Sequence, residues 1–124
     1  MAMILRAKGV ILGDAPSARG RVEVLLTPVL HTGEARMSAV AARMGLSRQT
    51  LFRRLRDEGV TFEAVVGQLR RRMALHYLEA RKASVKETAY LVGFSEPAAF
   101  SRAFKRWTGM CPRDARGRGD ATPA

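Results

Sequence analysis

The side chains of this sequence best suited to chemistry with another molecule are its arginines. The chain of 124 residues carries 22 basic and 11 acidic side chains, a net charge of +11, and all but four of the basic residues are arginine. The planar guanidinium group binds phosphate oxygens and guanine edges through paired hydrogen bonds. The charge balance alone fits three kinds of partner: nucleic acid, an anionic membrane surface or an acidic protein.

The residues that enzymes use for nucleophilic or metal chemistry are sparse. Cys111 is the single cysteine, which excludes a disulfide bond within the chain and a multi-cysteine zinc site. His31 and His76 lie far apart in the sequence, and neither is accompanied by a cluster of carboxylates. We therefore expect no catalytic site, no metal site and no cofactor, and predict that the chain is not an enzyme.

The apolar runs indicate no contact with a membrane. None of them reaches the length of a membrane-spanning helix. Arg6 and Lys8 fall where a secretory signal would need an apolar core. A reducing cytoplasm is the expected location.

Two segments of the chain repeat one pattern 48 positions apart. Residues 41–47 read AARMGLS and residues 89–95 read AYLVGFS. In each copy the Ala lets two helices approach closely, the Gly four positions later supplies the positive φ of a tight turn, and the Ser caps the next helix. This is the pattern of a helix-turn-helix. Two copies in a strongly basic chain predict a protein that contacts double-stranded DNA through both.

The apolar stripe of each following helix shows which side chains face outward. Leu51 and Leu55 mark the buried side of the first helix, and Phe100, Phe104 and Trp107 mark that of the second, at about 100° per residue. Outward Gln can pair with adenine and outward Arg with guanine. The predicted base-reading residues are Gln49, Phe52, Arg53, Ala98, Ser101 and Arg102. The predicted phosphate contacts are Arg48, Arg54, Arg56, Lys105 and Arg106. Because Phe52 lies on the flank of its helix, a thymine-methyl contact and a place in the core both stay open for it.

A long helix is expected to join the two copies, and no strand pattern appears, so the predicted fold is all-α. The predicted helices cover about 22–29 (interrupted by Pro28), 37–44, 48–57, 62–81, 84–92 and 97–107, with a further turn from Pro112. The predicted buried stripe of the longest helix is Phe62, Val65, Val66, Leu69, Met73 and Tyr77, with Arg70, Arg71 and Arg72 on its outside. About 20 residues at 1.5 Å each give roughly 30 Å, close to the 34–36 Å between successive major-groove faces.

Composition divides the chain into three parts. Residues 1–20 have the composition of an N-terminal segment and linker, and residues 21–115 form the predicted DNA-binding domain. This domain comprises subdomains at about 21–60 and 84–115 and a linker helix at about 62–81. Residues 116–124 lack apolar anchors and are expected to be a disordered tail. Two cores sharing the linker helix account for the apolar stripes, so the isolated chain is expected to be a monomer.

The chain resembles the DNA-binding module of AraC/XylS-type transcriptional regulators over about residues 21–115. The resemblance is most specific in residues 92–109, VGFSEPAAFSRAFKRWTG, which are similar to the C-terminal signature of the family. It implies seven helices, with two homeodomain-like three-helix subdomains joined by a long helix. It also implies regulation of transcription, usually activation with contact to RNA polymerase. The base-reading positions of the family fall on Gln49, Phe52, Arg53, Pro97, Ala98, Ser101 and Arg102.

The sequence departs from the family pattern in ways that leave alternatives open. Pro97 and Ala98 cannot donate hydrogen bonds to bases, so the second copy is expected to recognise DNA shape and phosphate more than sequence. Arg36 and Cys111 replace the usual serines near two helix starts. Most members also carry an N-terminal effector or dimerisation domain. Residues 1–20 are therefore either the remnant of such a domain, with a full-length protein that dimerises, or the start of a short stand-alone regulator. The alternative function is that of a non-specific, nucleoid-type DNA-binding protein.

Overall fold

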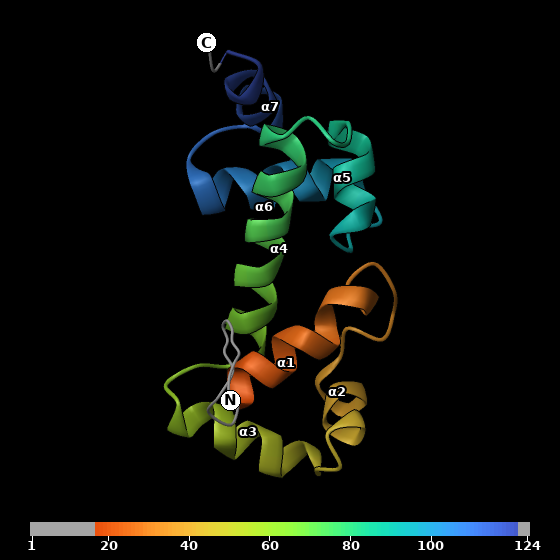
Figure 1. Cartoon of the computed structure of the whole chain (residues 1–124), viewed down its shortest axis with the longest axis vertical. Helices are drawn as coiled ribbons and strands as arrows, with labels where there is room; N and C mark the ends of the chain where they lie inside the picture. The colour runs from red at the N-terminus through yellow and green to blue at the C-terminus, as the bar shows by residue number, and fades with distance from the viewer. Residues whose placement is uncertain (1–16, 122–124) are drawn as a thin grey trace, which may run out of the picture.

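The computed structural model describes residues 17–121, with side chains to residue 117, and all regular secondary structure in this part of the chain is helical (Figure 1). The elements are α1 (Ala18–Leu26), the 3-10 turn η1 (Thr27–Val29), α2 (Met37–Arg43), α3 (Arg48–Asp57), α4 (Phe62–Glu79), α5 (Val85–Leu91), α6 (Pro97–Thr108) and α7 (Pro112–Ala121). Residues 17–121 contain no strand, and the predicted all-α fold is confirmed.

The long helix α4 joins two groups of helices (Figure 1). The first unit consists of α1, α2 and α3, and the second unit consists of α5, α6 and α7. The first unit gathers around the N-terminal half of α4, and the second unit around its C-terminal half. The predicted arrangement of two helix-turn-helix units on one linker helix is therefore confirmed.

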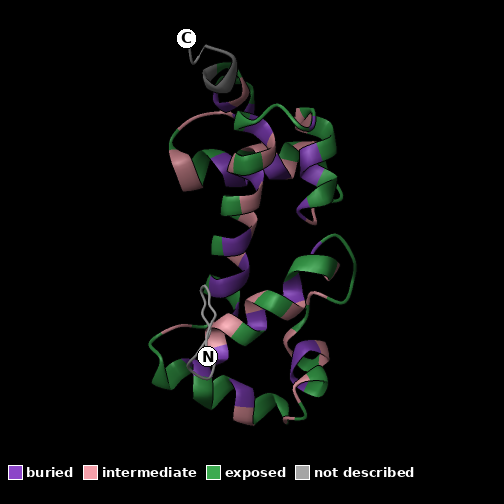
Figure 2. Ribbon diagram, viewed as in Figure 1, coloured by how far each residue is buried: buried purple, intermediate pink, exposed green. Residues whose placement is uncertain are grey.

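Helix α4 buries different faces in its two halves (Figure 2). The buried side chains are Phe62, Val65, Val66 and Leu69 in the N-terminal half, and Ala74 and Leu78 in the C-terminal half. At about 100° per residue, the second set points roughly 150° away from the first. Met73 and Tyr77 were expected to continue the first stripe, but both are only half-buried. The reason is that each unit packs against its own side of the shared helix.

The two units share one continuous hydrophobic core that passes through α4. In α3, Leu51 and Leu55 are at most 1% exposed, as predicted, and in α6 Phe100 and Phe104 are fully buried. Trp107 was expected to complete the stripe of α6, but it is half-buried. Its ring packs 6.1 Å from that of Phe94, at the edge of the core.

Three predicted helix starts have the expected side-chain caps. The Ser47 hydroxyl accepts a hydrogen bond from the Thr50 N–H at 3.1 Å at the start of α3. Thr61 caps α4 in the same way. At α5, the Ser84 hydroxyl accepts from the Glu87 N–H at 3.0 Å, and the Glu87 carboxylate accepts from the Ser84 N–H at 2.8 Å. This reciprocal pair is a capping box.

Two other helix starts lack a side-chain cap. Ser95 was expected to cap α6, but the N-cap residue is Glu96 and its side chain makes no capping hydrogen bond. Pro97 occupies the first helical position, where its fixed φ suits the helix and its missing N–H leaves one donor fewer to satisfy. Arg36 precedes α2 without capping it and instead donates from Nε to the Gly33 carbonyl oxygen at 2.9 Å.

The helices at both ends of the described chain extend beyond the residues predicted for them. Helix α1 starts at Ala18 rather than near residue 21, and Ser17 caps it. Helix α7 continues to Ala121, through residues expected to be a disordered tail. Ala115 is fully buried, and Arg116 donates from Nε to the Ala83 carbonyl oxygen at 3.2 Å, which holds α7 against the segment before α5. The expectations for residues 1–16 and 122–124 lie outside the described residues.

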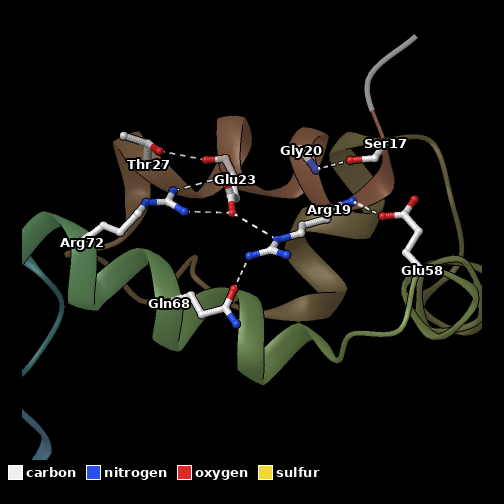
Figure 3. Close-up of polar contacts among 8 residues, drawn as sticks. All are labelled: Ser17, Arg19, Gly20, Glu23, Thr27, Glu58, Gln68 and Arg72. Carbon is white, nitrogen blue, oxygen red and sulfur yellow. Dashed lines mark hydrogen bonds and ion pairs between the residues drawn. The ribbon is translucent and has the colours of Figure 1, made fainter. Parts of the chain in front are cut away.

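A polar network attaches α1 to α4 and to the end of α3 (Figure 3). Arg72 of α4 pairs with Glu23 of α1, with 3.1 Å between Nη2 and Oε1. Arg19 pairs with the same carboxylate at 3.5 Å and donates a hydrogen bond to Gln68 of α4. The Glu58 carboxylate, just after α3, accepts from the backbone N–H of Arg19 at 3.0 Å. Helix α1 thus ties α3 to the linker helix.

Candidate nucleic-acid interface

The two predicted turns have the same backbone geometry. Gly45 and Gly93 both have positive φ, 73° and 98°. The residue after each glycine, Leu46 or Phe94, donates its N–H to the carbonyl oxygen of the alanine five positions earlier, at 2.9 Å in both copies. The sequence repeat is therefore a structural repeat, and α3 and α6 are its equivalent second helices.

Helix α3 presents the side chains that the sequence placed on its outer face. Gln49 and Arg53 are exposed, opposite the buried Leu51 and Leu55. Phe52 is 49% exposed, so it lies outside the core and its ring faces solvent. The predicted phosphate contacts of this unit, Arg48, Arg54 and Arg56, are also exposed. The exposed surface of α3 therefore carries one amide, one aromatic ring and four guanidinium groups.

Helix α6 presents a less polar face than α3. Ala98, Arg102, Lys105 and Arg106 are exposed, whereas Pro97 and Ser101 are half-buried. Among the predicted base-reading positions of this unit, the hydrogen-bonding side chains are those of Ser101 and Arg102. The two units consequently differ in how many base edges they can contact.

Arg53 and Arg102 occupy equivalent places on α3 and α6. Both are exposed, and no described acidic residue forms an ion pair with either of them. Their guanidinium groups are thus available to an external acceptor. A guanidinium group is suited to the O6 and N7 acceptors of guanine.

A cleft of about 850 Å³ between the two units is lined by four arginines. Arg36 and Arg48 of the first unit line it, together with Arg70 of α4 and Arg106 of the second unit. Glu63 is the one acidic residue in this lining. Arg36 was missed because it lies on no predicted recognition helix, whereas Arg70 was expected on the outside of the linker helix.

Arg70 is the least exposed of the four cleft arginines. Its guanidinium carbon lies 5.3 Å from the ring centre of Phe94, a cation–π contact, and its Nε is buried without a hydrogen-bond partner. Burial lowers the pKa of Arg70 from its ordinary value. No signal in the sequence distinguished it from the neighbouring Arg71, which is exposed.

Among residues 17–121, no three His, Cys, Asp or Glu side chains are grouped so that they could hold a metal ion. No helix in that range is long and apolar enough to span a membrane. Cys111 is half-buried and carries a free thiol.

Known proteins with similar sequences are transcription regulators. A helix-turn-helix domain family model matches residues 40–118. The transcriptional activator RhaS of Escherichia coli O139:H28 is 40% identical over 117 residues, covering 92% of this chain and 42% of RhaS. The regulator VirS of Mycobacterium tuberculosis is 35% identical over 99 residues, covering 80% of this chain and 29% of VirS. The chain thus spans less than half the length of these curated relatives.

Solved structures with the same fold include transcriptional regulators. A DNA-binding transcriptional dual regulator from Escherichia coli K-12 gives a TM-score of 0.82 at 21% identity, covering 90% of this chain and 99% of that structure. The regulator CdpR from Pseudomonas aeruginosa gives a TM-score of 0.71 at 31% identity, covering 81% of this chain and 31% of that structure. The fold and the paired recognition helices define a helix-turn-helix DNA-binding protein. The chain belongs to the AraC family of transcription regulators, a family of non-enzymatic proteins.

Proposed function

We propose that this chain binds a specific double-stranded DNA site by placing α3 and α6 in two successive major grooves. The observation that carries the proposal is the equivalent placement of two exposed basic helices at the two ends of α4. The 18 residues of α4 correspond to about 27 Å at 1.5 Å per residue. This is somewhat less than the 34–36 Å between successive major-groove faces. Simultaneous docking therefore requires DNA that bends towards the protein, or a loosely seated second unit.

In the proposed complex the first unit makes most of the base contacts. Arg53 pairs with guanine, Gln49 pairs with adenine, and the exposed ring of Phe52 packs on a thymine methyl group. In the second unit Arg102 and Ser101 supply the hydrogen bonds. Pro97 and Ala98 offer none, so this unit recognises DNA shape and phosphate more than sequence.

Phosphate contacts supply the part of the affinity that does not depend on sequence. We assign them to the exposed basic residues that border the two recognition faces, Arg48, Arg54, Arg56, Lys105 and Arg106. Arg36, which lines the cleft, extends this basic surface from the first unit towards the second. Neutralising phosphates releases counterions, so the affinity should fall steeply as salt concentration rises.

The regulatory outcome proposed for the chain is activation of transcription through contact with RNA polymerase. RhaS, which is 40% identical to it, is named an activator, and this supports the assignment. The proposed location is the cytoplasm, and the proposed state of the isolated chain is a monomer on its DNA site.

Binding selection from random DNA, followed by titration, tests sequence specificity. The selected site should bind at least about 10³-fold more tightly than random DNA at the same salt concentration. Equal affinities would instead identify a nucleoid-type protein that binds DNA without regard to sequence.

Groove-specific footprinting on the selected site tests the use of two units. We expect protection of two successive major grooves on one face of the duplex, centred about 10 base pairs apart. Arg102→Ala should weaken the protection of one groove and leave the protection of the other unchanged. Protection of a single groove that Arg102→Ala does not change would mean that the first unit alone recognises the DNA sequence.

A further inference from the structure

The two equivalent turn glycines have different surroundings. A Cβ atom added to Gly45 would meet no atom within 4 Å beyond its chain neighbours. A Cβ atom added to Gly93 would collide with the backbone carbonyl oxygen of Leu30, which belongs to the first unit. Both glycines have positive φ, so turn geometry accounts for a glycine at either position. At Gly93 alone the missing side chain also permits close approach of another part of the chain.

Three parts of the fold meet at Gly93. Leu30 follows η1 in the first unit and is 1% exposed, buried in the hydrophobic core. From α4, Arg70 reaches the same turn: its Nη2 and Nε would lie 3.2 and 3.5 Å from the added Cβ. Its guanidinium group also covers the ring of Phe94. Leu30, Arg70, Gly93 and Phe94 thus form a junction between the first unit, the linker helix and the second unit.

We propose that this junction fixes the separation and rotation of the two recognition helices, and so sets the spacing of the two half-sites that the chain can bind together. The linker helix alone would allow the second unit to tilt about the end of α4. Contact of the Gly93 turn with the backbone of Leu30 removes that freedom at the place where the two units approach each other. Gly93 and Arg70 act as positioning residues, because they orient α6 without contacting DNA.

The first experiment measures the distance between the units in the absence of DNA. Spin labels are attached through Asp57→Cys in the first unit and Lys86→Cys in the second, both exposed positions, in a Cys111→Ser background. Pulsed electron paramagnetic resonance should give one narrow distance distribution. Gly93→Ala should shift or broaden it, whereas Gly45→Ala, which also places a side chain at positive φ but causes no collision, should leave it unchanged. Unchanged distances in Gly93→Ala would overturn the proposal.

A second pair of variants keeps the test decisive if Gly93→Ala fails to fold. Arg70→Met keeps the aliphatic part of the side chain and removes the guanidinium group from Phe94. Arg71→Met changes the exposed neighbour on the same helix and serves as the control. We expect a broadened distribution for Arg70→Met only. Identical distributions for the two variants would contradict the role given to Arg70.

The second experiment measures half-site spacing and rests on the proposed function. Inserting one base pair between the half-sites displaces one of them by about 3.4 Å along the DNA axis. Wild type and Gly45→Ala should lose at least about tenfold in affinity on this insertion, a loss similar to that of one mismatched base pair. The affinity of Gly93→Ala should fall much less on the same insertion. If wild type tolerates the insertion, two-unit binding is wrong, whereas an unchanged spin-label distance in Gly93→Ala would be a failure of the junction itself.

Discussion

Glu58 accepts a hydrogen bond from the backbone N–H of Ala18 at 2.7 Å, so the residue that ends α3 caps the start of α1. The same carboxylate accepts from the N–H of Arg19 at 3.0 Å, the contact drawn in Figure 3. The first backbone N–H groups of a helix lack partners within the helix, and its N-terminus favours negative charge. Glu58 satisfies both requirements from 40 residues away in the chain.

Glu58→Ala should therefore lower the free energy of unfolding by about 1 kcal/mol, the usual cost of losing a helix cap. Asp57→Ala is the matched control. Asp57 is the adjacent exposed carboxylate, and its one ion pair, with Arg56, has an N–O distance of 4.0 Å. Urea denaturation of the two variants should show the larger loss for Glu58→Ala. Equal losses would mean that the cap on α1 contributes nothing to stability.

The capping box of α5 should make the stability of the chain depend on pH. The backbone N–H of Ser84, then its hydroxyl, and more weakly the charge of Arg116, lower the pKa of the Glu87 carboxyl from 4.5. A carboxyl whose pKa is lower in the folded state stabilises that state above the unfolded pKa. This stabilisation is lost as the pH falls through the folded pKa.

Glu87→Gln should thus lower the melting temperature at neutral pH, and the difference from wild type should shrink as the pH falls below about 4.5. Thermal unfolding followed by circular dichroism measures the difference at each pH. In a Ser84→Ala background the same substitution should have a somewhat smaller effect, because the hydroxyl is removed while the backbone N–H of residue 84 still donates to the carboxylate. A difference that stays constant down to acid pH would show that the ionised carboxylate has no special role.

Local signals predicted the recognition helices well. Ser47 caps α3 as expected, Gly45 and Gly93 adopt the positive φ of the predicted turns, and Leu51 and Leu55 are buried. These features depend on residues within a few positions of each other, so composition and periodicity were sufficient. The helical periodicity of about 100° per residue also predicted which faces of α3 and α6 are exposed.

Features that depend on how the two units meet could not be predicted from periodicity. The stripe of α4 changes sides at Ala74 because the second unit packs there, and a pattern within one helix does not show which partner takes which side. Arg70 was expected on the outside of α4, yet its Nε is buried against the second unit. The collision that would follow a side chain at Gly93 involves Leu30, which is distant in sequence.

The isolated chain should be a monomer in solution. The apolar side chains of its helices are used in the shared core, and the large exposed ones, Val24, Phe52, Tyr90 and Leu91, are divided between the two units. A stable dimer generally buries about 800 Å² on each partner, which scattered side chains do not provide. Sedimentation velocity should give a single species of monomer mass at all concentrations tested. A dimer would contradict this and would direct attention to residues 1–30.

Arg53 and Arg102 should recognise the base sequence. Arg71→Ala, on the linker helix, is the control for both substitutions. Arg53→Ala and Arg102→Ala should each cost about 1–3 kcal/mol on the selected site and much less on random DNA, because a guanidinium group on a guanine edge is lost. Arg71→Ala removes an exposed charge that lies on neither recognition helix. It should weaken binding to all DNA alike, or leave binding unchanged. Titrations of both DNAs at one salt concentration give the comparison. If Arg53→Ala weakened binding to both DNAs equally, the Arg53 guanidinium group would contact phosphate. Base recognition by the first unit would then depend on Gln49 and Phe52.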